Sequence, residues 1–325
     1  MAVCCHRRRD GVPVGPTTGT GHSATSDRRG GGCGVLADAA GAVRCAASAA
    51  TRAAGAPGCG WAVVAAARAA ARAVAGRRNQ GDASTLVREG LDDGIVPKHI
   101  ALIMDGNRRY GRREHGAAIE GHRAGGEKLR DFVVWCSEAG VAVLTAFAFS
   151  TENWKRQPHE VDAMMELFLS EVPKLGECTE KLNARVRFLC SEPEPIPVRV
   201  RSAMDGLEAR TSTCDGLQVN ICLSYGGRGD VVQACRELSR DVIAGNLQVD
   251  AINETALSRR LLTGDMPDPD VLIRTSGELR LSNFLIFQLA YTELFFLDKH
   301  WPDVTREDFL EVIEEYRKRG RRFGK

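Results

Sequence analysis

The sequence predicts an α/β fold in which a largely parallel sheet is surrounded by helices. Short apolar runs that suit buried strands alternate with longer segments whose apolar residues recur every three or four positions, the spacing of an amphipathic helix. Alternation of this kind favours a parallel sheet, because each parallel connection needs a crossover that is usually helical. A hydrophobic fraction of 43% is ample for a buried core.

Six apolar runs are expected to form strands, and five periodic segments are expected to form helices. The strands are residues 99–104, 141–149, 186–190, 217–223, 271–273 and 294–297. The helices are residues 121–139, 160–182, 198–211, 230–244 and 306–319. Because no internal repeat interrupts this order, we predict one domain over 97–325, preceded by a linker over 81–96.

Residues 1–80 form a basic leader, in contrast to the domain that follows. They contain eleven Arg, no Lys and three Asp, a balance of +8, whereas the remaining residues carry a balance of −6. The acidic domain argues against a nucleic-acid partner. The leader is rich in Ala, Arg and Gly and lacks the apolar core of a secretory signal, so it resembles an organelle transit peptide, with plastid favoured over mitochondrion. A disordered alanine-rich tail is the alternative.

The cysteines do not suggest a metal site or a disulfide framework. Five of the eleven lie in the leader, and no CxxC spacing occurs. We therefore expect the other six to be reduced core cysteines in an intracellular compartment. They are Cys136, Cys178, Cys190, Cys214, Cys222 and Cys235.

The stretch HIALIMDGNRRYGRR places polar residues where the first predicted strand ends. Open α/β sheets bind ligands at the carboxyl ends of their strands, so Asp105 occupies an expected ligand position. Gly106 allows close backbone approach, and Asn107 tolerates unusual backbone angles. Four arginines that suit phosphate oxygens follow, namely Arg108, Arg109, Arg112 and Arg113. A simple turn with a solvated basic face is the alternative.

Polar residues also follow two other predicted strands. After VLTAFAFS the chain reads STENWKRQP, which offers Ser150, Glu152, Asn153, Trp154 and Arg156. Helix capping by Thr151 or Asn153, with Trp154 in the core, is the alternative there. After residues 271–273 the chain reads IRTSGELRLSNF, which offers Arg274, Ser276, Glu278, Arg280 and Ser282. Two arginines on one short loop can bind a diphosphate by bidentate, charge-assisted hydrogen bonds.

Taken together, these motifs resemble the signature regions of the cis-prenyltransferases, which include undecaprenyl and dehydrodolichyl diphosphate synthases. The resemblance rests on MDGNRRY, GHRAG, FSTENWKR, RTSGELRLSNF, QLAYTEL and WPD, which occur in that order. It covers residues 97–325, which it identifies as the catalytic domain, and leaves the leader outside. It implies the family's α/β fold with a deep hydrophobic tunnel, usually assembled as a homodimer. Arg322, Phe323 and Gly324 match a C-terminal element that completes the site across the dimer in homomeric members.

The resemblance also implies a reaction and its partners. Isopentenyl diphosphate would condense with an allylic diphosphate primer to give a cis-polyprenyl diphosphate, with Mg²⁺ as the cofactor. The lipid product would bring the protein to membranes only peripherally. The paired-aspartate DDxxD signature of trans-prenyltransferases is missing from the sequence, which favours the cis class.

Roles for individual residues follow from the same resemblance. Asp105 matches the magnesium-associated aspartate and is expected to be catalytic together with Asn107. Gly106, Asn107, Arg109 and His122 match the allylic diphosphate site. Arg274, Arg280 and Ser282 match the isopentenyl diphosphate site. Ser150, Glu152, Trp154 and Arg156 are implicated in loop closure and substrate placement, and Glu293 in the metal region or in its support.

Some features leave alternatives. Relatives often carry an arginine where this chain has Ala118, so Arg112 or Arg113 is expected to take its place at the diphosphate. The helix over 160–182 is a candidate tunnel wall through Met164, Met165, Leu167, Phe168 and Leu169, with plain core packing as the alternative. A nucleotide-dependent phosphotransferase is disfavoured because GxxxxGK[ST] does not occur. An accessory, inactive subunit is disfavoured because Asp105, Arg274 and Arg280 are all retained.

Overall fold

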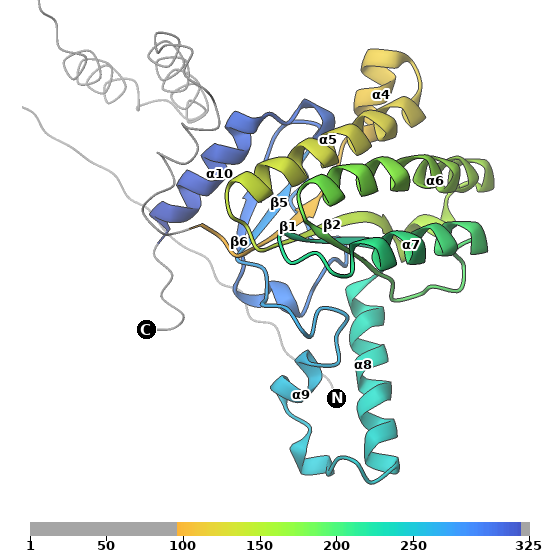
Figure 1. The fold of residues 1–325 in the computed structure, drawn as a ribbon, viewed down its shortest axis with the longest axis vertical. Coiled ribbons are helices and arrows are strands. Elements are labelled where there is room, and N and C mark those ends of the chain that lie inside the picture. The colour runs from red at the N-terminus through yellow and green to blue at the C-terminus, as the bar shows by residue number, and fades with distance from the viewer. Residues whose placement is uncertain (1–95, 320–325) are drawn as a thin grey trace, which may run out of the picture. The chain divides into compact units, whose positions relative to one another are not determined.

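A six-stranded sheet forms the centre of the fold. The computed structural model describes residues 96–319 of the 325-residue chain. The strands are β1 (His99–Ile103), β2 (Val143–Ser150), β3 (Arg185–Leu189), β4 (Gln218–Tyr225), β5 (Val271–Arg274) and β6 (Glu293–Phe296). Every neighbouring pair is parallel, in the order β3-β4-β2-β1-β5-β6 (Figure 1). All six predicted strands are present with ends within two residues of those expected, so the parallel α/β prediction is confirmed.

All five predicted helices are present, together with two that were not predicted. The helices are α4 (Asn107–His115), α5 (Ala118–Glu138), α6 (Pro158–Lys181), α7 (Val198–Thr211), α8 (Gly227–Ile243), α9 (Glu254–Ser258) and α10 (Arg306–Lys318). Within residues 96–319, no helix is both long enough and apolar enough to cross a membrane. The expectations for the leader, for nearly all of the linker and for Arg322–Gly324 concern residues outside the described range.

The sheet buries both of its faces, because successive side chains of a strand point to opposite sides. Ile100 and Leu102 of β1 pack into a large cluster with α5, α6, α7 and α10, which cover one face (Figure 1). Ala101 and Ile103 pack on the other face against Phe284, which belongs to the segment after β5. Each large apolar side chain buried in this way contributes about 1.5–3 kcal/mol. The carboxyl ends of β1, β2 and β5 are thereby held side by side.

Helix α4 was not predicted, because its sequence NRRYGRREH has no apolar period. Backbone contact with α5 places it. A Cβ atom on Gly121 would lie 1.9 Å from the carbonyl oxygen of Asn107, and one on Gly111 would lie 2.5 Å from the nitrogen of Gly121. Only glycine permits this approach, so a tertiary contact positions the helix that carries the arginines.

Four of the six described cysteines pack in the core as expected, whereas Cys214 is half-buried outside the hydrophobic clusters and Cys235 is exposed. None of the six cysteines in the described part of the chain forms a disulfide. Cys136 and Cys222 are buried, and burial raises the pKa of both thiols well above the ordinary value. Cys235 is exposed on α8, so the prediction that it lies in the core was wrong. Its neighbours at helical spacing, Ala234 and Leu238, face the core instead.

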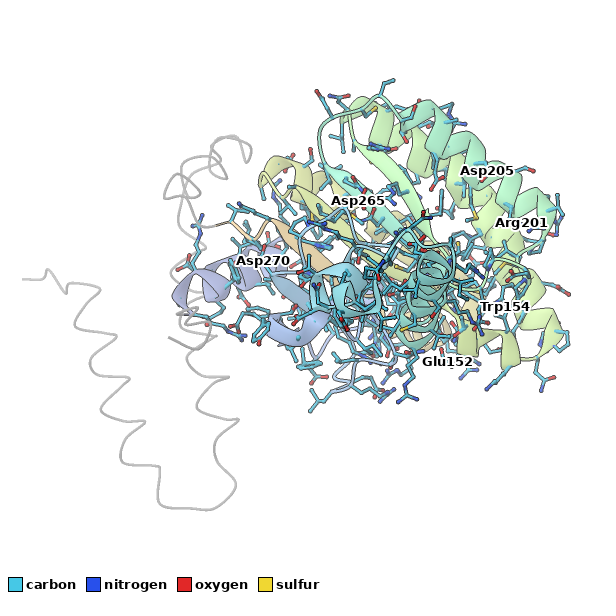
Figure 2. The ribbon with its side chains drawn as sticks, turned by 90° about the horizontal axis from the view of Figure 1, so that it is seen from below. Glu152, Trp154, Arg201, Asp205, Asp265 and Asp270 are labelled. Atoms are coloured by element: carbon cyan, nitrogen blue, oxygen red, sulfur yellow. The ribbon has the colours of Figure 1, made fainter. Side chains whose placement is uncertain are left out.

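A buried histidine ties the amino end of β1 to β2. His99 is fully buried, with Nδ1 2.7 Å from the carbonyl oxygen of Pro267 and Nε2 2.7 Å from Oγ1 of Thr145. Since the carbonyl can only accept, Nδ1 carries the proton, and Nε2 accepts from the threonine hydroxyl. Burial lowers the pKa of His99 to about 4, although the carbonyl of Pro267 and the charge of Asp270 oppose the shift. Asp270 is labelled in Figure 2.

This histidine makes the stability of the fold depend on pH. Between pH 6.5 and 4 the unfolded chain binds a proton at His99 that the native chain excludes, so acidification lowers the free energy of unfolding. The loss from this group is about 3 kcal/mol over that window. Urea unfolding at several pH values should show a smaller acid destabilisation in His99→Gln than in the wild type. Equal pH dependence in the two proteins would contradict the assignment.

Candidate active site

A polar cleft opens where the carboxyl ends of β1, β2 and β5 meet. Its volume is about 510 Å³. Six arginines line it, and one carboxylate, Asp105, faces them among the described residues. The arginines are Arg108, Arg109, Arg112, Arg156, Arg274 and Arg280. Such an excess of guanidinium groups suits a highly charged anion such as a diphosphate.

The turn between β1 and α4 forms the floor of this cleft. Gly106 has φ 96° and precedes the first residue of α4, Asn107. A Cβ atom on Gly106 would lie 2.7 Å from Oγ of Ser276 and 2.8 Å from Nδ1 of His300, so a larger residue has no room. Glycine also provides no capping side chain, which leaves the first amide groups of α4 available to an anion. The sequence expectation for Gly106 therefore fits the geometry.

Asp105 links this turn to β5 through a short ion pair. Its Oδ1 accepts a hydrogen bond from the amide of Gly106 at 2.7 Å, and its Oδ2 accepts one from Nη2 of Arg274 at 2.8 Å. Nη2 of Arg109 lies 3.7 Å from Oδ1. The Asp105 side chain stays 30% exposed, so part of the carboxylate still faces the cleft.

Arg274 is the most buried charge of the site, with a side chain only 3% exposed. Besides Asp105, its guanidinium donates to Oγ of Ser282 at 2.8 Å and to the carbonyl oxygen of Arg280. Its Nε is buried and donates to no acceptor among the described residues. Arg280 is 60% exposed and pairs with Glu278, which also pairs with Arg109 at 3.0 Å. The three residues expected at the isopentenyl diphosphate are thus brought together.

The loop that carries these residues has a strained backbone. Ser276, Ser282, Asn283 and Leu285 all have positive φ, at 77°, 50°, 61° and 42°. Four non-glycine residues with positive φ within ten positions indicate that contacts with the surrounding structure hold the backbone of this loop in an otherwise unfavourable conformation. Asn283 provides one of them, because its Nδ2 donates to Oε1 of Glu152 at 3.0 Å.

His122 lies on α5 at the side of the cleft. Burial, together with the positive charges of Arg156 and Arg108, lowers the pKa of His122 to about 4. The imidazole is therefore neutral at pH 7 in the free protein. The pKa of Arg156 is lowered as well, first by burial and then by the charge of Arg108, but a guanidinium remains protonated after such a shift. A bound diphosphate would relieve this crowding of positive charge.

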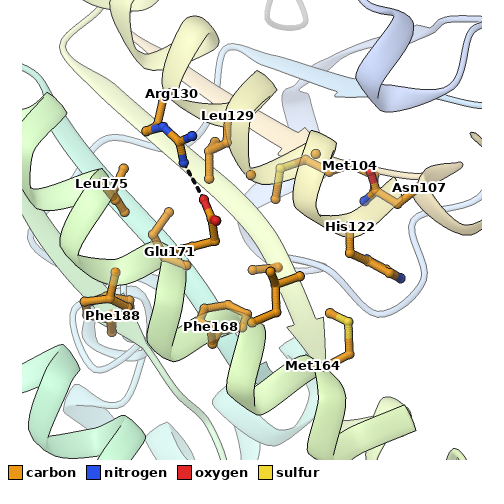
Figure 3. A pocket seen from close by; sticks show the side chains of 16 residues that line it. Met104, Asn107, His122, Leu129, Arg130, Met164, Phe168, Glu171, Leu175 and Phe188 are labelled. Atoms are coloured by element: carbon orange, nitrogen blue, oxygen red, sulfur yellow. Dashed lines mark hydrogen bonds and ion pairs between the residues drawn. The ribbon is translucent and has the colours of Figure 1, made fainter. Parts of the chain in front are cut away.

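An apolar cavity adjoins the polar cleft and shares part of its wall. Its volume in this structure is about 100 Å³. The residues that line both spaces are Met104, Asn107, His122, Ala148 and Met164. Figure 3 shows the cavity between α5 and α6, with Phe168 and Leu175 on its wall. Helix α6 is therefore a cavity wall through Met164, Leu167 and Phe168, whereas Met165 and Leu169 pack in the core.

Asn107 occupies the boundary between the two spaces. Its Nδ2 donates to the carbonyl oxygen of Met104 at 3.1 Å, whereas its Oδ1 is buried and accepts no hydrogen bond from any residue in 96–319. A Cβ atom on Gly125 would lie 2.4 Å from that oxygen, so Gly125 makes room for it. The boundary thus holds one unused hydrogen-bond acceptor.

The four residues expected from STENWKR separate into two groups. Ser150 and Arg156 line the cleft, together with Asn153. Trp154 packs against the ring of Phe149, with centroids 4.9 Å apart, and donates from Nε1 to Oγ of Ser224 at 2.8 Å. Glu152 is exposed and lies outside the cleft lining (Figure 2). In this structure Trp154 and Glu152 therefore stabilise the turn and do not line the cleft. For Trp154 this agrees with the alternative given above, in which its side chain packs in the core.

Glu293 does not lie near Asp105, so its expected place in the metal region was wrong for a single copy of the chain. The parallel register pairs Glu293 with Val271 at the start of β5, whereas Ile103 pairs with Arg274 at its end. Glu293 therefore lies at the opposite edge of the sheet, where its carboxylate accepts from Nη1 of Arg319 at 2.7 Å.

Asp105 alone meets the requirement for a magnesium carboxylate. No three His, Cys, Asp or Glu side chains in residues 96–319 cluster closely enough to hold a metal by themselves. Magnesium, however, commonly binds through one or two carboxylates, several waters and substrate phosphate oxygens. A partly exposed carboxylate in an arginine-lined cleft fits that donor set, with a diphosphate supplying the remaining oxygens.

Sequence reasoning could not tell which of the arginines after Asp105 face the cleft. Arg112 lines the cleft, whereas Arg113 pairs with Asp303 at 2.8 Å outside it, which resolves the earlier alternative in favour of Arg112. Arg108 also lines the cleft. Which of these arginines faces the cleft depends on its position around α4, and the sequence of that helix has no apolar periodicity that would reveal its orientation.

Comparisons with known proteins agree with this geometry. A family profile described as "Putative undecaprenyl diphosphate synthase" matches residues 103–324. The chain belongs to the cis-prenyltransferase family. It is therefore a prenyltransferase, and the condensation of prenyl diphosphates is the reaction of its class.

Individual cis-prenyltransferases match most of the described residues. The tritrans,polycis-undecaprenyl-diphosphate synthase (geranylgeranyl-diphosphate specific) of Pyrococcus horikoshii is 43% identical over 239 residues, which cover 73% of this chain and 90% of the relative. The isoprenyl transferase of Thermotoga maritima is 43% identical over 229 residues, which cover 70% of this chain and 97% of the relative. The crystal structure of lavandulyl diphosphate synthase from Lavandula x intermedia, in complex with dimethylallyl diphosphate, superposes with a TM-score of 0.69 at 31% identity, covering 72% of this chain and all of that chain.

Proposed function

We propose that this protein is a Mg²⁺-dependent cis-prenyltransferase that condenses isopentenyl diphosphate with an allylic diphosphate to give a cis-polyprenyl diphosphate. The observation that carries the proposal is the junction of two unlike spaces. A cleft lined by six arginines adjoins an apolar cavity, and five residues line both spaces. A prenyl diphosphate has the same two parts, a charged head and a hydrocarbon tail.

The cleft offers two subsites for two diphosphates. The first amides of α4, together with Arg109 and His122, suit the allylic diphosphate, because Asn107 at the start of α4 and His122 line both the cleft and the apolar cavity. Arg274, Arg280 and Ser282 suit the isopentenyl diphosphate, since they form a second cluster across the turn. Asp105 lies between the two subsites and contacts Arg274 directly.

The proposed reaction breaks the allylic C–O bond, joins the allylic carbon to the terminal alkene carbon (C4) of isopentenyl diphosphate, and releases a proton from C2 to solvent, so that the new double bond lies between C2 and C3. Diphosphate leaves with the electron pair of the broken bond. The arginines stabilise that leaving charge in a partly water-excluded cleft. Bound magnesium, held by Asp105 and diphosphate oxygens, would supply Lewis-acid stabilisation of the same leaving group. Asn107 and Met104 hold the reacting carbons at the mouth of the apolar cavity.

Two further proposals concern assembly and location. We propose a homodimer in which the edge strand β6 takes part, because Leu294 on β6 and Tyr291 just before it expose 37% and 76% of their surfaces. The leader over 1–80 is proposed to direct the protein to an organelle, a plastid before a mitochondrion, on the basis of its composition. The polyprenyl product would associate the protein peripherally with membranes.

A product assay tests the proposed function. The purified protein is incubated with radiolabelled isopentenyl diphosphate and, in turn, dimethylallyl, geranyl, farnesyl and geranylgeranyl diphosphate, and the products are sized by chromatography. We expect chain elongation from at least one primer with Mg²⁺ and none after chelation with EDTA. Incorporation that is equal with and without Mg²⁺ would contradict the metal requirement.

Phe168→Ala provides the accompanying test of the cavity. Because Phe168 lines the apolar cavity and not the cleft, its removal enlarges the space for hydrocarbon without touching the arginines. We expect longer products at an unchanged affinity for isopentenyl diphosphate. Leu169→Ala is a matched control on the same helix, because Leu169 packs in the core and does not line the cavity.

A further inference from the structure

Two charged side chains line the apolar cavity, Arg130 of α5 and Glu171 of α6. They form an ion pair with each other, and their side chains are only 22% and 15% exposed. Figure 3 shows this pair at the opposite end of the cavity from Asn107 and His122. Partly buried charges are unfavourable unless paired, so a pair at the end of a hydrocarbon site requires an explanation.

The surroundings keep the carboxylate charged and in place. Glu171 also accepts from Nζ of Lys174 at 2.8 Å. Burial would raise the pKa of Glu171, but the hydrogen bonds from Lys174 and Arg130 outweigh it and lower the pKa below its ordinary value. A Cβ atom on Gly126 would lie 2.8 Å from Oε2 of Glu171, so a larger residue there would shift the carboxylate from its present position beside α5.

Arg130 of the ion pair lies between the cavity and a second hollow. This hollow has a volume of about 480 Å³. Lys174 and Lys181 contribute to that hollow, and both come from α6. Arg130 is thus a wall of two spaces, one apolar and one at the charged surface.

We propose that the Arg130–Glu171 ion pair, which we term the charged stop, closes the apolar cavity and limits the length of the prenyl chain. This inference rests on the proposed function. A growing chain can displace or rearrange apolar side chains at little cost. A hydrocarbon end that reaches the charged stop would displace the water and the hydrogen bonds of Arg130 and Glu171. Because a hydrocarbon cannot form hydrogen bonds, it offers these charges no replacement. Elongation therefore stops in favour of product release.

Three variants test the charged stop. Glu171→Ala removes the carboxylate, and the double variant Arg130→Leu with Glu171→Leu removes both charges while keeping most of the bulk. Glu180→Ala is the matched control, because Glu180 also lies on α6 and pairs with Arg210 at 2.9 Å, away from the cavity. Each protein is assayed with one primer and labelled isopentenyl diphosphate, with thermal unfolding as the check on folding. The double variant leaves no unpaired charge in the cavity wall, because Lys174, which also loses its partner, does not line the cavity and is 44% exposed to solvent. It therefore keeps the test open if Glu171→Ala unfolds.

We expect products longer by at least one five-carbon unit in Glu171→Ala and in the double variant. Wild-type product length is expected in Glu180→Ala, and the initial rate of incorporation should change by less than about threefold in all three, since the cleft is intact. Wild-type length in the double variant, or lengthening in Glu171→Ala alone, would overturn the role assigned to charge. A wild-type protein that incorporates no isopentenyl diphosphate contradicts the proposed function, and this inference with it.

Discussion

Asp105→Asn is expected to lower kcat for condensation by about 10²–10³-fold, because it removes the only carboxylate of the cleft described here. The amide keeps the shape of the side chain and an oxygen that can accept from Arg274, so the fold should persist. The lost negative charge weakens magnesium binding and the balance of charge around the leaving diphosphate. Steady-state kinetics with saturating substrates measure the effect.

A matched control separates catalysis from a general loss of charge. Asp303 pairs with Arg113 of α4 at 2.8 Å but does not line the cleft. Asp303→Asn should therefore retain kcat within about twofold, since exposed ion pairs contribute little. Thermal unfolding of both variants checks their folding. Activity of Asp105→Asn within a few-fold of the wild type would remove Asp105 from the proposed mechanism.

Arg274 and Arg280 should differ in the size of their effects, although one motif supplies both. A charge-assisted contact contributes roughly 1.5–3 kcal/mol, so Arg274→Ala should weaken the binding of isopentenyl diphosphate about ten- to a hundredfold. Arg280 is 60% exposed and shares Glu278, so Arg280→Ala should weaken it less, by about tenfold or below. Isothermal titration calorimetry without a primer measures both affinities.

The variant Arg274→Lys tests geometry at the same position. The guanidinium of Arg274 reaches Asp105, Ser282 and the carbonyl of Arg280 at once. An ammonium keeps the charge but lacks the planar fork, so we expect only partial recovery relative to Arg274→Ala. Normal affinity in both Arg274→Ala and Arg280→Ala would refute the isopentenyl diphosphate subsite.

The sheet and the central pair of the site could be predicted from the sequence for one reason. Apolar runs mark buried strands, and parallel strands bring their carboxyl ends to one edge. Asp105 and Arg274, which are 169 positions apart, meet there at 2.8 Å. The same rule explains why Glu293 was misplaced, because it precedes the end of β6 and so lies at the other edge.

Features that depend on tertiary contact could not be predicted in this way. Helix α4 is positioned by the approach of Gly111 to Gly121, which leaves no periodic pattern. Whether Trp154 faces substrate or core depends on the ring of Phe149 and the hydroxyl of Ser224. The same sequence of a turn allows its aromatic residue to face the substrate or to pack in the core.

The charged stop shows the same limit for the cavity. Arg130 and Glu171 are 41 positions apart, and each resembles an ordinary charged residue on an amphipathic helix. Only the packing of α5 on α6 turns their charges inward. Periodicity predicted the helix α6, and the tunnel implied by the family resemblance made it a candidate wall, but neither identified the residues that end the cavity.

The geometry of the newly formed double bonds tests the central account most directly. The full chain is incubated with Mg²⁺, an accepted allylic primer and ¹³C-labelled isopentenyl diphosphate, and the product is examined by ¹³C NMR. The account predicts that every added unit carries a cis double bond and that Asp105→Asn forms at least about a hundredfold less product at matched enzyme concentration and time. Trans double bonds in the added units, or equal product from both proteins, would contradict it.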